Sequence, residues 1–201
     1  MPSIVIGIDF GSSYSTASWL LVEKGISVYL PQIVRNWPAT SPRDSGFAKV
    51  PTKIHYDESD PDILPDYLDD SFEVKNACRA ILHADKTVIQ VVGYYLTQLY
   101  DHTLGEIAAK IGQHKLEKSI IQISFAVPTG WDERAKDRLM LAVRSTKIMD
   151  SYSARRTQPS FIGESEAAAI GTLADVVDRS QISQESPETT LLVLDVGGTT
   201  S

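Results

Sequence analysis

Cysteine and histidine are scarce in this sequence, which limits the kinds of site that it can build. Cys78 is the single cysteine among 201 residues, so no disulfide can form within the chain and a thiolate-rich metal site is excluded. The four histidines are scattered, and no two are spaced by one turn of a helix. A zinc enzyme is therefore not expected, and the low cysteine content fits a reducing compartment.

Basic residues and long apolar runs are also few. The 19 Lys and Arg residues against 26 Asp and Glu give a net charge of −7, which argues against a surface devoted to nucleic-acid phosphate or anionic lipid. No apolar run approaches the roughly 20 residues that a bilayer span needs. The first basic residue is Lys24, so the pattern of a basic leader is not expected here. We expect a cytoplasmic protein that binds neither nucleic acid nor membrane.

The hydrophobic pattern predicts an α/β fold with a mixed sheet. Apolar runs predict strands, and apolar residues at helical spacing predict helices. The predicted strands cover 4–8, 15–22, 27–34, 50–56, 119–127, 159–163 and 191–196, and the predicted helices cover 88–99, 129–149 and 164–177. Short turns join the first three strands, which indicates an antiparallel meander, whereas the later strands alternate with helices.

The first and last predicted strands end in similar loops. Asp9 and Asp195 each begin an Asp-x-Gly sequence that continues in small or hydroxyl-bearing residues. Glycine allows backbone to approach an anion closely, and successive N–H groups in a tight turn bind phosphate oxygens. Serine and threonine hydroxyls add donors, and an aspartate can hold Mg²⁺ through water. The loop residues are Gly11, Ser12 and Ser13 after the first strand, and Gly197, Gly198, Thr199 and Thr200 after the last.

One such loop alone is simply a strand that ends in a turn. Two copies at equivalent strand ends favour a clamp that closes on a polyphosphate and its metal ion. The Walker motif and the Gly-x-Gly-x-x-Gly motif are both absent from the chain. This absence argues against a P-loop and weakens a dinucleotide-binding interpretation.

The segment from Gly7 to Ser15 resembles the first phosphate motif of the seventy-kilodalton heat-shock chaperones of the DnaK type, in the actin and sugar-kinase superfamily. Residues 125–128 resemble the connecting Val-Pro segment of that family, and 163–170 resemble its Glu-Pro-x-Ala-Ala-Ala helix start. Residues 195–200 resemble its second phosphate motif. The similarity is weak through about residues 57–87, as in the atypical chaperone-like ATPases common in fungi. The helix start favours chaperones over sugar kinases.

The resemblance implies a ribonuclease H-like lobe of the actin-like ATPase type. Residues 1–40 would form its first part and 116–180 its second part. Residues 41–115 would form a smaller inserted α/β subdomain, and 181–201 a linker with the first strand of a truncated second lobe. Clients and co-chaperones would bind through regions beyond this sequence, and the exposed strand 191–196 would favour self-association. We expect negligible ATP hydrolysis by residues 1–201 alone.

The resemblance also implies ATP or ADP and Mg²⁺ as cofactors, and it assigns roles to single residues. Glu164 would orient or deprotonate the attacking water, and Lys75 would lie near the terminal phosphate. Pro128 would couple the nucleotide state to client binding. Asp9 and Asp195 would hold the metal through water, and Tyr14 would join the glycine and hydroxyl residues of the two loops in binding nucleotide.

Two residues depart from the family pattern and leave other functions open. Ser165 stands where the family has proline, and Thr199 stands where it has a glycine near phosphate. These departures favour a degenerate, non-catalytic scaffold that keeps the fold and binds nucleotide weakly. A sugar-kinase-like phosphotransferase is a further alternative. Tyr94 and Tyr95 are expected to pack or face solvent and not to bind a ligand, and Trp131 is expected to be a core or staple residue.

Overall fold

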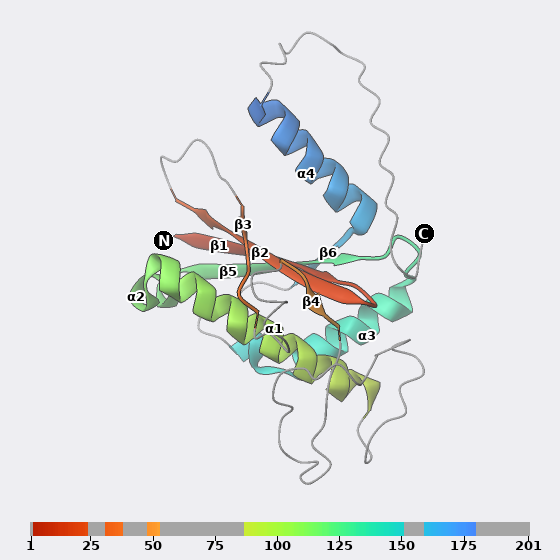
Figure 1. Cartoon of the computed structure of the whole chain (residues 1–201). Coiled ribbons are helices and arrows are strands. Elements are labelled where there is room, and N and C mark those ends of the chain that lie inside the picture. The colour runs from red at the N-terminus through yellow and green to blue at the C-terminus, as the bar shows by residue number, and fades with distance from the viewer. Residues whose placement is uncertain (1, 24–30, 38–47, 53–86, 151–158, 180–201) are drawn as a thin grey trace.

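The structure is a computed structural model that describes residues 2–23, 31–37, 48–52, 87–150 and 159–179. These residues form a six-stranded sheet in which parallel and antiparallel pairs are mixed, with helices on both faces (Figure 1). The predicted mixed α/β class is therefore confirmed. None of the helices in these ranges is long and apolar enough to cross a membrane.

The sheet is built around β1, which pairs with an antiparallel strand on one side and a parallel strand on the other. Its strand order is β3-β2-β1-β5-β6, with β4 also paired to β2. The strands are β1 (Ser3–Phe10), β2 (Tyr14–Val22), β3 (Gln32–Ile33), β4 (Val50–Pro51), β5 (Ile120–Val127) and β6 (Ser160–Gly163). The predicted meander of the first three strands is confirmed, and β5 and β6 run parallel to β1.

One face of the sheet carries the hydrophobic core. Side chains of a strand alternate between its two faces, and the alternate residues from Ile4 to Phe10 in β1 are buried. β5 shows the same alternation, with Phe125 fully buried beside Ile8. The opposite face is more polar, and there Gly7 lies between Ser18 of β2 and Ser124 of β5.

The helices divide between the two faces. They are α1 (Val88–Ile111), α2 (Gln113–Glu117), α3 (Glu133–Arg144), the 3₁₀ helix η1 (Lys147–Asp150) and α4 (Glu164–Arg179). Helices α1 and α3 contact each other and cover the core face, whereas α4 lies on the opposite face against β5 and β6 (Figure 1). The observed α4 confirms the helix predicted at 164–177.

Helix α1 is part of the same core as the sheet. Its Leu96, Tyr100 and Ile107 are buried in one hydrophobic cluster with side chains of β1 and β5. In the sequence this helix falls within 41–115, the range expected to form an inserted subdomain. The division of the chain into domains stays a prediction, and residues 53–86 lie outside the described residues.

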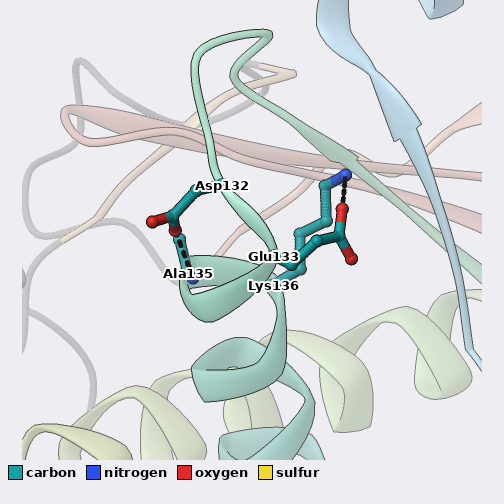
Figure 2. Close-up of polar contacts among 4 residues, drawn as sticks. All are labelled: Asp132, Glu133, Ala135 and Lys136. Atoms are coloured by element: carbon teal, nitrogen blue, oxygen red, sulfur yellow. Dashed lines mark hydrogen bonds and ion pairs between the residues drawn. The ribbon is translucent and has the colours of Figure 1, made fainter.

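The predicted helix at 129–149 is wrong at both ends. Asp132 caps α3, because its side chain accepts a 2.9 Å hydrogen bond from the backbone N–H of Ala135 (Figure 2). The preceding residues form a turn in which Trp131 donates its backbone N–H to the carbonyl of Pro128. Helix α3 ends at Arg144, and Ser145 follows as its C-cap. The cap and the turn thus make the observed helix shorter than the one predicted from apolar spacing alone.

Several predicted strands are short or lie partly outside the described residues. Of the strand predicted at 27–34, only Gln32–Ile33 is a strand among the residues described. Of the strand predicted at 50–56, Val50–Pro51 is observed, and residues beyond Thr52 are outside the description. The strand predicted at 191–196, with its expected self-association, also lies outside it.

Candidate functional site at the carboxyl edge of the sheet

Three parallel strands end at the same edge of the sheet. The carboxyl ends of β1, β5 and β6 are Phe10, Val127 and Gly163. In open α/β sheets, ligands bind outside the carboxyl ends of the strands. The site residues predicted from the sequence that flank this edge are Asp9, the loop residues 11–14, Pro128 and Glu164.

The first predicted phosphate loop connects β1 to β2. Phe10 and Ser15 are its last paired residues, so the connection runs through Gly11, Ser12 and Ser13 to Tyr14. A Cβ placed on Gly11 would lie only 2.5 Å from the carbonyl oxygen of Tyr14. The turn can therefore close in this form only with glycine at position 11. Ser12 and Tyr14 are exposed beside it, as a ligand-binding loop requires.

Segment 50–52 and helix α1 support this loop from behind. The backbone N–H of Thr52 donates to the carbonyl of Ser13 over 2.9 Å. The Tyr95 hydroxyl of α1 donates to the carbonyl of Pro51 over 3.2 Å, and the Tyr95 ring lies 5.8 Å from that of Phe10. Tyr95 therefore packs, as expected, and it also links the end of β1 to segment 50–52.

A buried pair of hydroxyl groups completes this support. Ser15 Oγ lies 2.8 Å from Thr52 Oγ1, and both residues are buried. Sequence reasoning did not single out Ser15 or Thr52. The available signal was the position of Ser15 in β2, where it alternates with Ala17 and Trp19 and so belongs to the buried face. A hydroxyl on that face needs a partner, because an unpaired buried polar group is unfavourable.

Asp9 lies on the face of the sheet opposite the core. It alternates with Ile8 and Phe10, which are buried in the core, and it pairs in register with Thr16 of β2 and Ala126 of β5. The oxygen Oδ1 of its carboxylate is buried. A carboxylate at the end of a strand, with one oxygen shielded from water, has the chemistry to attract a hydrated cation or a donor-rich ligand.

Glu164 begins α4 directly after β6 and is partly buried. Val127 and Gly163 are the last paired residues of β5 and β6, so Pro128 and Glu164 leave neighbouring strand ends. Just beyond them, Thr129 Oγ1 lies 3.2 Å from Ser165 Oγ. Sequence reasoning identified Ser165 only as a departure from the family and did not single out Thr129.

The start of α3 also lies next to this edge, and its charges are largely satisfied locally. Lys136 Nζ donates to Glu133 Oε1 over 2.8 Å within the first turn (Figure 2). Arg134 is exposed as the second residue of the helix. Trp131 is partly buried against the hydrophobic core, in agreement with a packing role.

The second loop and the predicted lysine are not part of the described structure. Lys75, Asp195, Gly197, Gly198, Thr199 and Thr200 lie outside the described residues. Within the ranges that are described, no group of three or more His, Cys, Asp or Glu side chains could hold a metal ion. Asp9 fits a magnesium ion only as one ligand of a largely water-coordinated site, which is how Mg²⁺ is commonly bound in proteins.

Neither a scan against protein-family models nor a search of curated proteins finds a match for this chain. What the chain can bind must therefore be inferred from the geometry of the carboxyl edge and from the chemistry of the residues gathered there.

Proposed function

We propose that this chain is the ATP-binding lobe of a chaperone-like ATPase with an actin-like fold, which uses Mg²⁺ and ATP hydrolysis to drive client binding and release. The observation that carries the proposal is the meeting of Asp9, the Gly11 loop and Glu164 at one edge of the sheet. These are the residues in which the chain resembles the heat-shock ATPases. The three-stranded meander followed by parallel strands supports the actin-like assignment.

The first loop has the features of a phosphate-binding turn. Gly11 lets the chain turn tightly, and the exposed Ser12 provides a backbone N–H and a hydroxyl at the edge. Asp9 would contact the water shell of a magnesium ion and not the phosphate itself, because two anions repel each other. Bound Mg²⁺ would neutralise charge on the phosphates.

Glu164 would be the residue that acts on water. It starts α4 at the end of β6, next to the segment that leaves β5 through Pro128. A carboxylate in this role orients the attacking water or accepts its proton, which typically contributes about 10²- to 10⁴-fold in rate. Pro128 lies in the adjacent turn and would transmit the state of the site to other parts of the protein.

Calorimetric titration of Mg-ATP and Mg-ADP into the chain tests the proposal directly. We expect saturable binding of both nucleotides that weakens when EDTA removes the metal. An oligonucleotide and a hexose serve as ligands of other classes, and neither should bind. Absence of heat with both nucleotides, in a sample shown to be folded by circular dichroism, would contradict the proposal.

A nucleotide-binding scaffold without catalysis is the second candidate, and Ser165 is the observation that favours it. This serine occupies the first turn of α4, where the resembled family has proline. Glu164→Gln separates the two candidates in a longer protein that contains this chain. An ATPase should lose turnover in the variant but retain nucleotide, whereas a scaffold should show no turnover before the change and the same nucleotide binding after it.

A further inference from the structure

Thr129 and Ser165 connect two elements just beyond the end of the sheet. β5 and β6 are parallel, and Val127 beside Gly163 is their last paired position. Each strand continues for two residues to a hydroxyl side chain, and the two oxygens lie 3.2 Å apart. The hydrogen bond thus extends the contact between β5 and β6 into the first turn of α4.

Thr129 lies close to both sequence neighbours of Glu164. Its Oγ1 contacts Ser165, the residue that follows Glu164. The same oxygen lies 3.9 Å from the place that a Cβ on Gly163 would occupy, which is the residue that precedes Glu164. Because β6 passes into α4 without a loop, any shift of this first turn relative to β5 moves Glu164 as well.

The turn that carries Thr129 is anchored at both ends. On one side, the carbonyl of Pro128 accepts a 3.0 Å hydrogen bond from the backbone N–H of Trp131. On the other, Asp132 caps α3 (Figure 2). Thr129 is exposed, so water competes for its hydroxyl, but its backbone belongs to a defined turn.

We infer that Thr129 and Ser165 are positioning residues whose hydroxyl bridge holds the first turn of α4, and with it Glu164, in place at the carboxyl edge. The consequence for catalysis rests on the proposed function, since a misplacement of about 1 Å can lower a rate about 100-fold. The orientation of Glu164 itself can be measured without nucleotide. The two claims are therefore tested separately.

Four single variants distinguish an effect of the hydroxyl bridge from an effect of side-chain packing. Thr129→Val keeps the shape of the side chain and removes the hydroxyl, whereas Thr129→Ser keeps the hydroxyl. Ser165→Ala removes the other half of the bridge. Ser160→Ala is the matched control, because Ser160 Oγ donates to the carbonyl of Ile123 over 3.4 Å between the same two strands, away from the carboxyl edge.

The first readouts are amide hydrogen exchange over residues 163–167 and the NMR chemical shift of the Glu164 carboxyl carbon. We expect Thr129→Val and Ser165→Ala to speed exchange roughly threefold to tenfold, as loss of one hydrogen bond predicts. Both should move the Glu164 signal by a similar amount, and the double variant should add little to either single one. Thr129→Ser and Ser160→Ala should leave exchange and signal as in the wild type.

Other outcomes would contradict either the inference or the proposed function. Unchanged exchange in both Thr129→Val and Ser165→Ala would show that the hydroxyl bridge does not stabilise the first turn of α4, and would overturn the inference. Faster exchange with an unmoved Glu164 signal would leave the pair a purely structural role and would overturn the inference. If the signal moves but the chain binds no nucleotide, the proposed function fails while the positioning of Glu164 stands. Where ATP turnover is measurable, a fall in kcat with KM kept within about twofold supports the inference.

Discussion

The hydroxyl oxygens of Ser15 and Thr52 lie 2.8 Å apart, and both residues are buried behind the Gly11 loop. Ser15 belongs to the start of β2, and Thr52 follows β4, so the pair joins two segments that are distant in sequence. The backbone N–H of Thr52 also donates to the carbonyl of Ser13 in the loop. The conformation of the loop therefore depends on segment 50–52 as well as on its own residues.

Loss of either hydroxyl should destabilise the chain. Ser15→Ala leaves the Thr52 hydroxyl buried without its partner, and Thr52→Val does the same to Ser15, at a cost of about 1–3 kcal/mol each in the free energy of unfolding. The double variant should lose less than the sum of the two single variants, because it removes both polar groups. Urea denaturation of the four proteins measures this coupling. Strictly additive losses would mean that the two hydroxyls do not interact.

Gly11→Ala should disturb the loop itself. The new Cβ would lie 2.5 Å from the carbonyl oxygen of Tyr14, and a backbone atom cannot move away as easily as a flexible side chain. We expect a loss of about 1–3 kcal/mol in the free energy of unfolding, together with weaker Mg-ATP binding. Thermal denaturation and calorimetric titration measure the two effects.

Gly130→Ala is the matched control for this change. Gly130 is in the turn between β5 and α3 at the same edge, and a Cβ placed there meets no atom within 4 Å. This variant should remain within about 0.5 kcal/mol of the wild type and keep its affinity for nucleotide. Equal effects of the two substitutions would count against a special requirement for glycine at position 11.

Asp9→Asn should weaken the dependence of nucleotide binding on magnesium. The substitution keeps the size of the side chain but removes the negative charge that would attract the hydrated ion. Loss of such an outer ligand typically lowers metal affinity about 10- to 100-fold. The measured quantity is the ratio of ATP affinities with Mg²⁺ and with EDTA. Asp137→Asn, which removes the same charge from an exposed site on α3, is the control and should leave the ratio unchanged. A wild-type ratio in Asp9→Asn would exclude Asp9 from the metal site.

The features predicted correctly from the sequence are those that depend on local patterns of residues. The strand at 119–127 follows from a segment rich in apolar residues and the helix from Glu164 follows from a run of small residues, and both are observed. Asp9, Gly11 and Glu164 lie at one edge because β1, β5 and β6 run parallel, and this pairing is not predicted from the sequence. The sequence also suggests the loop glycine, because strand and turn signals are adjacent there.

The features that were missed depend on contacts between distant segments. No local pattern indicates that Thr52 pairs with Ser15, or that Thr129 reaches Ser165, because each pair is formed only once the sheet has assembled. The start of α3 was misplaced for a different reason. Apolar spacing is insensitive to the turn at 128–131, whereas the helix boundary is set by one hydrogen bond that the Asp132 side chain accepts from the backbone N–H of Ala135.

That boundary provides a test that is independent of function. Asp132 accepts a 2.9 Å hydrogen bond from the backbone N–H of Ala135, which satisfies a donor that the helix leaves free at its start. Asp132→Ala should therefore lower the free energy of unfolding by about 0.5–2 kcal/mol, measured by urea denaturation. Asp137→Ala changes the same residue type within the helix, where no cap is lost, and should stay within about 0.5 kcal/mol of the wild type. If the two variants behaved alike, the Asp132 cap would make no net contribution to the free energy of unfolding.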